Sequence, residues 1–313
     1  MLTDMDPELQ AHVSLFPEAR LDDVDAARQG LAALAATTPR PDAAGVEVTD
    51  RTLPADPPVP VRIYRPRTPQ GAIVWMHGGG FVMGGVDVEH PWVSRVAADT
   101  NALVVSVEYR LAPEDRFPAA LDDAYAALVW TADQAAALGI DTERIAVAGH
   151  SAGATLAAAV ALRARAKQGP RICFQLLNQP ALDDRQTTWS AREFTDTVFL
   201  TREKVAASWR HYLGDTTAGP YAAPARAEDL SGLPPAYIAT AELDPNRDEA
   251  IEYALRMLQS GVSVELHQWA GTFHGSQAIL TADVSQRQLT EIGAVLVRAL
   301  APRSNAEATA VNA

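Results

Sequence analysis

The stretch that decides the fold is "IAVAGHSAGATLAAA", residues 145–159. A short apolar run ends at Gly149, and an alanine-rich run typical of a helix starts just after Ser151. Gly149 and Gly153 are small where the strand and the helix approach each other, while the serine between them takes strained dihedrals that expose its oxygen. The pattern predicts a strand, a sharp turn and a helix, with Ser151 as a candidate nucleophile. A chance match in a glycine-containing loop is the alternative, and the flanking strand and helix patterns disfavour it.

Apolar runs and helix-like runs alternate on both sides of this turn. Short, continuous apolar runs predict strands covered on both faces at residues 72–77, 102–109, 145–149, 173–178, 236–242 and 264–269. Helix-spaced apolar residues predict helices at residues 90–100, 117–138, 151–167 and 247–261. The last two helices are expected to end with left-handed caps near Gly169 and Gly261.

Two runs of strict alternation, residues 46–53 and 59–66, add an antiparallel pair at the start of the sheet. The fold class is therefore α/β, with about eight strands in a mostly parallel sheet and helices on both faces.

The chain divides into segments of different character. Residues 1–42 are predicted to form an N-terminal helical cap segment, and residues 43–303 the main α/β domain. Residues 181–232 break the alternation of strands and helices and are expected to form an insertion above the sheet. Together the two additions would cover the end of the strands where ligands bind in open α/β sheets. Residues 304–313 are predicted to be a disordered tail.

Charge and composition exclude several classes of function. The chain has 313 residues, a formal net charge of -13 and no basic cluster, which disfavours nucleic-acid binding and stable membrane association. No segment approaches the roughly 20 apolar residues of a membrane span, and no signal peptide is visible, so a cytoplasmic protein is predicted. The single cysteine, Cys173, lies in an apolar run and is predicted to be a buried, inert thiol.

Two histidines could serve Ser151 as a base. His274 follows the last predicted strand, in a loop that also holds Gly271 and Gly275, and it fits the chain order serine, acid, histidine. His150 is adjacent to Ser151, but a side chain next to the nucleophile on a tight turn points away from the serine oxygen. His274 is therefore the predicted base. His150 has two open interpretations, a hydrogen-bonded residue of the pocket wall or an electrostatic influence on the site.

The acid that orients the histidine is expected after the preceding strand, in "IATAELDPNRDEA", residues 238–250. Asp244 is the first candidate because it lies in the loop at the end of that strand. It could also cap the following helix, with Pro245 at the first helical position, and the two roles are compatible. Asp248, about one turn into the helix, is the second candidate, and Glu242 is a third.

The third predicted strand ends in the glycine run "HGGG", residues 77–80. Such a run lets backbone N–H groups point toward one place, and the amide of Ala152, directly after the nucleophile, adds another donor. Together they would form an oxyanion hole. A phosphate-binding loop is the alternative, but the lysine and Ser/Thr of that motif are missing.

With these residues assembled, the sequence resembles the bacterial hormone-sensitive-lipase-like (family IV) carboxylesterases of the α/β-hydrolase fold. The resemblance rests on "HGGGF", "VEYRLAPEDRFPAALDDAYAAL", "GHSAG", "DPNRDE" and "FHG" and spans most of the chain. By position, it implies the nucleophile Ser151, the acid Asp244, the base His274 and an oxyanion hole of the Gly79, Gly80 and Ala152 amides. The family more often has aspartate where this chain has His150, and "DPL" where it has "DPN".

The resemblance also implies a helical cap and a preference for small, short-chain acyl esters, hydrolysed through an acyl-enzyme. Phe81, Val205 and Trp209 are candidates for the acyl pocket, because helical spacing puts the last two on one face. Packing of the cap onto the core is the alternative for these three. No metal or organic cofactor is needed, and the resemblance admits a homodimer. The same triad could serve a lactonase, a carbamate hydrolase or an amidase, whereas a ligand-binding, receptor-like member would need a broken triad.

Overall fold

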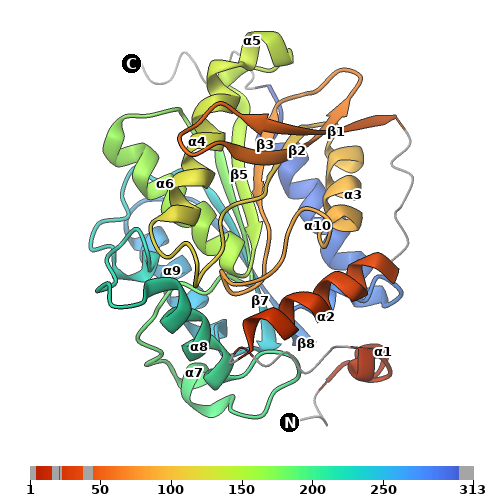
Figure 1. The fold of residues 1–313 in the computed structure, drawn as a ribbon, viewed down its shortest axis with the longest axis vertical. Coiled ribbons are helices and arrows are strands. Elements are labelled where there is room, and N and C mark those ends of the chain that lie inside the picture. The colour runs from red at the N-terminus through yellow and green to blue at the C-terminus, as the bar shows by residue number, and fades with distance from the viewer. Residues whose placement is uncertain (1–4, 16–20, 22, 38–44, 303–313) are drawn as a thin grey trace.

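A mixed sheet forms the centre of the fold (Figure 1). The computed structural model describes residues 5–15, 21, 23–37 and 45–302. The strands in these ranges are β1 (Val46–Leu53), β2 (Val59–Pro66), β3 (Ala72–Met76), β4 (Leu103–Val107), β5 (Ile145–His150), β6 (Phe174–Asn178), β7 (Ala236–Leu243) and β8 (Val264–Phe273).

The strand order is β1-β2-β4-β3-β5-β6-β7-β8. β2 pairs antiparallel with β1 and with β4, whereas the pairs from β4 to β8 are parallel. The predicted eight-stranded, mostly parallel sheet with an antiparallel start is confirmed.

Helices cover both faces of this sheet, as predicted. The helices described are α1 (Pro7–Gln10), α2 (Val24–Thr37), α3 (His90–Thr100), α4 (Ala119–Asp133), α5 (Ala135–Leu138), α6 (Ala152–Lys167), α7 (Trp189–Glu193), α8 (Arg202–Leu213), α9 (Arg247–Gln259) and α10 (Asp283–Leu300). Short 3₁₀ turns are η2 (Val13–Leu15), η3 (Thr142–Arg144), η4 (Pro224–Arg226) and η5 (Ser276–Ala278).

The two helical layers follow from the alternation of side chains along each strand. In β3, Val74 and Met76 belong to the core that packs under α4, α6 and α9. Ile73 and Trp75 point the other way, into the core under α3 and α10. The strands are thus apolar on both faces, which is why they appear as continuous apolar runs in the sequence.

Several predicted boundaries differ from the structure. The helix predicted at residues 117–138 is divided at Gln134 into α4 and α5. The left-handed residue after α6 is Gln168, at φ 50°, rather than Gly169, whereas Gly261 after α9 is left-handed as expected, at φ 79°. Helix α10 was not predicted. Cys173 is half-buried rather than buried.

The two predicted additions contribute helices near the same end of the molecule. Figure 1 shows α2, α7 and α8 together below the sheet, with α1 beside them. The predicted insertion contains the short helix α7 as well as α8. Parts of the predicted cap segment 1–42 and the whole predicted tail 304–313 lie outside the described residues. In the described part of the chain, no helix has the length and apolarity that a membrane crossing requires.

Candidate active site

Ser151 lies on the sharp turn between β5 and α6, as the sequence predicts. Its backbone has φ 54° and ψ -121°, a left-handed conformation that is strained for a non-glycine residue. A Cβ added to Gly149 would lie 2.4 Å from the Gly153 backbone, and one added to Gly153 would lie 2.1 Å from the Met76 carbonyl oxygen. The two glycines therefore allow the helix to start against the sheet, while Ser151 itself carries the strain.

Ser151, His274 and Asp244 form one continuous hydrogen-bonded chain. The Ser151 Oγ lies 2.8 Å from the His274 Nε2, and the His274 Nδ1 lies 2.7 Å from the Asp244 Oδ2. The carboxylate only accepts, so the Nδ1 carries the proton and the Nε2 accepts from the serine hydroxyl. All three are buried, with 8%, 2% and 1% of their surface exposed for Ser151, His274 and Asp244. The structure brings together the three residues predicted from separate strand ends.

Asp244 makes a second contact that corrects one detail of the prediction. Its Oδ1 accepts a hydrogen bond of 2.9 Å from the Asn246 N–H, while the Oδ2 faces His274. Helix α9 begins at Arg247, with Asn246 in the capping position, so Pro245 is not the first helical residue. Asp244 therefore holds the turn before the helix and the histidine at the same time.

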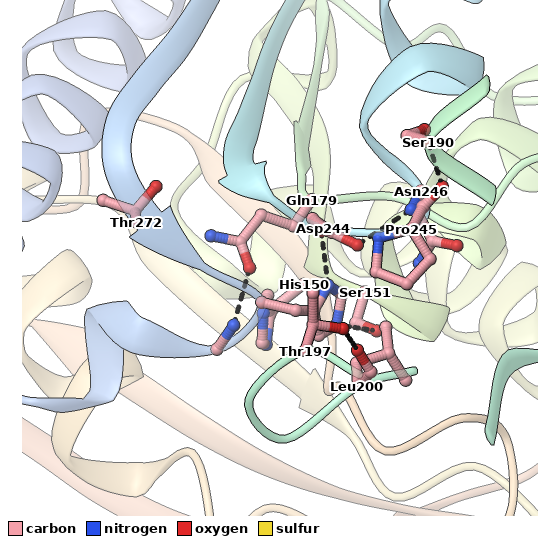
Figure 2. A network of polar contacts seen from close by, with 12 residues as sticks. His150, Ser151, Gln179, Ser190, Thr197, Leu200, Asp244, Pro245, Asn246 and Thr272 are labelled. Atoms are coloured by element: carbon pink, nitrogen blue, oxygen red, sulfur yellow. Dashed lines mark hydrogen bonds and ion pairs between the residues drawn. The ribbon is translucent and has the colours of Figure 1, made fainter. Parts of the chain in front are cut away.

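The other two acid candidates point elsewhere. The Asp248 Oδ2 accepts from the Ser190 N–H at 2.8 Å, and the Asp248 N–H donates to the Ser190 Oγ at 3.1 Å. This reciprocal pair joins α7 of the insertion to the start of α9. The Glu242 Oε2 accepts from the Gly271 N–H at 2.7 Å. Figure 2 shows Asp244 directed toward the serine turn and Ser190 on the far side of Asn246.

The glycine run after β3 takes the conformations that the motif requires. Gly79 has φ 124° and Gly80 has φ 60°, and a Cβ on Gly79 would lie 2.0 Å from the Met83 carbonyl oxygen. A Cβ on Gly80 would lie 2.5 Å from the Ser208 Oγ of α8. Neither the Gly79 nor the Gly80 N–H has a hydrogen-bond acceptor among the described residues. These amides are thus available donors beneath the insertion.

The three predicted pocket residues lie together. Phe81, Val205 and Trp209 are 1%, 4% and 4% exposed. The Phe81 ring stacks on Tyr212 at a centroid distance of 3.9 Å and lies 5.5 Å from the Trp209 ring. A cavity of about 650 Å³ lies elsewhere, against α2 and the β1–β2 pair, and these three residues are not in its lining. The cluster joins α8 to the glycine loop.

Known proteins resemble this chain in both sequence and structure. The family model described as alpha/beta hydrolase fold matches residues 73–278. The esterase LipI of Mycobacterium tuberculosis is 41% identical over 287 residues, which span 88% of each chain. The structure of a bacterial heroin esterase superposes with a TM-score of 0.91 at 43% identity, over 97% of this chain and 99% of that chain. The esterase LipW from Mycobacterium marinum superposes with a TM-score of 0.90 at 41% identity, over 96% and 98%.

The chain belongs to the hormone-sensitive-lipase-like carboxylesterases of the α/β-hydrolase fold. The resemblance seen in the sequence is thereby confirmed. Like the esterases that it resembles, the protein is a carboxylic ester hydrolase.

A largely buried glutamate that the sequence did not single out supports the glycine loop of this carboxylesterase. Glu89 precedes α3, and its side chain is 13% exposed. Its Oε1 accepts from the Gly78 N–H at 2.6 Å, and its Oε2 accepts from the Trp75 Nε1 at 2.5 Å. Burial by itself raises the pKa of Glu89, but the contacts with His150, His77 and the Gly78 N–H more than offset it, so the pKa lies below its usual value.

A second buried glutamate lies on the insertion side of the esterase site. Glu249 of α9 is 2% exposed, and its Oε1 accepts from the N–H groups of Leu182 and Asp183 at 2.6 and 3.1 Å. Its Oε2 has no hydrogen-bond partner in the described residues. Burial raises the pKa of Glu249 well above its usual value, and the carboxylates of Asp183 and Asp244 raise it further against the effect of the two N–H groups.

Proposed function

We propose that this carboxylesterase hydrolyses small, short-chain acyl esters with Ser151 as nucleophile, His274 as general base and Asp244 as the acid that orients it. The Ser151 Oγ attacks the ester carbonyl carbon while its proton passes to the His274 Nε2. The imidazolium then gives that proton to the leaving alkoxide. Water attacks the acyl-enzyme by the same route and returns the serine.

The observation that carries the proposal is the unbroken chain of 2.8 and 2.7 Å from the Ser151 Oγ through His274 to Asp244. The serine sits on a strained turn, which presents its oxygen at the end of the sheet. The amides of Gly79, Gly80 and Ala152 would hold the oxyanion. Free donors at Gly79 and Gly80 support this assignment, because they need no rearrangement when charge develops.

The predicted short-chain preference is supported by the aromatic residues beside the glycine loop. Phe81, Trp209 and Tyr212 pack against one another where α8 crosses Gly80. In this proposal α2, α7 and α8 act as the cap, and Phe81, Val205 and Trp209 limit the length of the acyl chain. The similar bacterial heroin esterase is named for an ester substrate, which supports ester hydrolysis by this chain. The family resemblance also allows a homodimer, and light scattering would measure the mass of the protein in solution.

The test is hydrolysis of p-nitrophenyl esters from acetate to laurate by the wild type and by Ser151→Ala. We expect Ser151→Ala to lower kcat by about 10⁴-fold to 10⁶-fold with the fold intact. Wild-type turnover should fall for chains longer than about six to eight carbons, because the aromatic cluster leaves no further room.

Ser94→Ala is the matched control, since Ser94 is also buried but lies on α3. An alanine variant at 151 that keeps more than a tenth of the wild-type rate would refute the nucleophile. Equal rates on acetate and laurate would refute the small acyl pocket and leave the triad intact. Preference for a lactone, a carbamate or an amide over all esters would reassign the substrate class.

A further inference from the structure

His150 lies beside the base without belonging to the triad. It is the last residue of β5 and the neighbour of Ser151, and its ring stacks on the His274 ring at a centroid distance of 5.6 Å and an angle of 25°. The Ser151 Oγ bonds to His274 and not to His150. The two ring nitrogens of His150 face two other segments, one through a hydrogen bond to Gln277 and one through a 3.7 Å contact with Glu89.

A polar chain connects one of these segments to the His150 Nε2. The Gly275 N–H donates to the Gln179 Oε1 at 2.8 Å, and the Gln179 Nε2 donates to the Gln277 Oε1 at 3.1 Å. The Gln277 Nε2 then lies 2.6 Å from the His150 Nε2. Figure 2 shows Gln179 extending from its strand end toward the loop that follows β8, with His150 nearby.

The direction of this chain is fixed at its far end. A backbone N–H can only donate, so the atom of Gln179 that faces Gly275 must be the carbonyl oxygen. The Gln179 NH₂ must then face an acceptor, which is the Gln277 carbonyl oxygen. The Gln277 NH₂ is left for His150, whose Nε2 must accept. The proton of a neutral His150 ring is therefore on the Nδ1.

The other side of the ring agrees with this assignment. The His150 Nδ1 lies 3.7 Å from the Glu89 Oε1, and that oxygen also accepts from the Gly78 N–H. A carboxylate favours an N–H directed toward it. Glu89 therefore favours the same tautomer as Gln277.

We propose that His150 is a positioning residue, held as the neutral Nδ1–H tautomer, that connects the glycine loop after β3 to the loop that carries His274. The proposal rests on the proposed function, in which the first loop supplies oxyanion donors and the second supplies the base. His150 is the one ring that both Glu89 and Gln277 contact in the described chain. His150 thereby fixes the distance between the two loops. The reaction needs this distance to be constant, because one loop supplies the oxyanion donors and the other supplies the base.

Protonation of His150 breaks this connection. An added proton on the Nε2 opposes the Gln277 NH₂, so Gln277 must rotate and Gln179 loses its acceptor. The titratable groups around the ring are Glu89 before α3, His274 after β8 and His77 at the end of β3. A neutral His150 also avoids a second positive charge next to the imidazolium that forms on His274.

The tautomer can be observed directly in the wild type by NMR of protein labelled with ¹⁵N-histidine. The His150 signals are those that disappear in His150→Phe, or in His150→Gln if the first variant does not fold. We expect a neutral ring with its proton on the Nδ1 at pH 8. A ring protonated on the Nε2, or an imidazolium at that pH, overturns the proposal. This readout needs no catalysis, so it is independent of whether Ser151 is the nucleophile.

The connection is tested by a double-mutant cycle of His150→Phe and Gln277→Leu on p-nitrophenyl acetate. Each change should lower kcat about 10-fold and change KM less than about threefold, because substrate contacts remain. The double variant should lose about as much as either single variant, since both break one chain. His267→Phe on β8 is the control and should leave both constants unchanged. Multiplicative losses near 100-fold, or a change in KM alone, would overturn the proposal.

Discussion

Two glutamates near the Ser151–His274–Asp244 chain, one buried and one largely buried, show how neighbours decide the protonation state of an acid. Glu89 accepts from one backbone N–H and from the Trp75 indole, whereas Glu249 accepts from two backbone N–H groups. Burial raises the pKa of both side chains. The pKa of Glu89 nevertheless lies below its usual value and that of Glu249 well above it. The difference lies in what surrounds each carboxyl group.

Glu89 faces histidine rings and two N–H donors, one for each of its oxygens. Glu249 faces the carboxylates of Asp183 and Asp244, and one of its oxygens has no partner in the described residues. The glycine loop is thus held by an ionised acid, and the start of the insertion by an acid that favours its protonated form. Burial alone predicts neither outcome, because its effect has the same sign at both positions.

The largest expected effect comes from removing the charge of Asp244, the proposed acid, which also acts on Glu249. Asp244→Asn should lower kcat by about 10³-fold to 10⁴-fold, because the amide no longer holds the His274 tautomer. It also removes one of the carboxylates that raise the pKa of Glu249. The loss of stability caused by Glu249 should therefore end at a lower pH in the variant than in the wild type, which thermal unfolding over a pH series would show.

Asp248→Asn is the matched comparison on the same segment. Asp248 bonds to Ser190 and does not contact His274, so kcat should stay within about threefold while stability drops by about 1 kcal/mol. If Asp248→Asn lost as much activity as Asp244→Asn, the acid would be misassigned.

Glu89→Gln should have the next largest effect. The two donors face different oxygens of Glu89, and glutamine replaces one of these oxygens with an NH₂ group, so either the Gly78 N–H or the Trp75 indole loses its acceptor. We expect a loss of about 2 to 3 kcal/mol of stability and about a tenfold lower kcat, measured by thermal unfolding and ester hydrolysis at pH 7.

The pH dependence of that loss follows from the lowered pKa of Glu89. The folded protein keeps the carboxylate at pH values where the unfolded chain already binds a proton, so the stabilisation is complete above the ordinary pKa of 4.5. It is lost as the pH falls through the lowered pKa. Wild type and Glu89→Gln should therefore converge only below about pH 4.5. Equal stability at pH 7 would contradict the role given to Glu89.

Glu249→Gln should have the smallest effect, and of the opposite sign. The folded state holds a proton on Glu249 at pH values above 4.5, where the unfolded chain releases it, so this residue costs stability as the pH rises. The variant should be more stable by about 1 kcal/mol at pH 8, or about 2 °C in Tm, with a smaller gain at pH 5. Glu252 is exposed on the same helix, so Glu252→Gln is the control and should change stability neither at pH 8 nor at pH 5. If Glu249→Gln had a lower Tm than the wild type at pH 8, Glu249 would be an ionised carboxylate whose oxygens all have hydrogen-bond partners.

The sequence predicted the sheet, its antiparallel start and the strand-end positions of Ser151, Asp244 and His274, because each of these depends on local pattern. Apolar continuity identifies buried strands, and the glycines around Ser151 reflect a collision with a neighbouring backbone. Helix α10 was missed although Val284, Leu289, Ile292 and Leu296 follow helical spacing, so that signal was present in the chain.

The residues around the triad could not be predicted in the same way. Glu89, Gln179 and Gln277 belong to no motif, and each acquires its role from a partner more than ten residues away in the sequence. Glu89 had one local cue, since it stands directly before the His-Pro start of α3, where an acid suits the helix N-terminus. That cue indicates a helix start and says nothing about Gly78.

The pair formed by Ser190 and Asp248 has a consequence for exchanging caps between related enzymes. Because α7 is joined to the residues directly after Asp244, the insertion is not an independent module that can be cut out at its two ends. A chimera could carry the insertion of a related enzyme but keep the start of α9 from this chain. Ser190 or Asp248 would then lack its hydrogen-bond partner, close to Asp244. Recombination boundaries in this family should therefore keep residues 188–190 and 245–248 from the same parent.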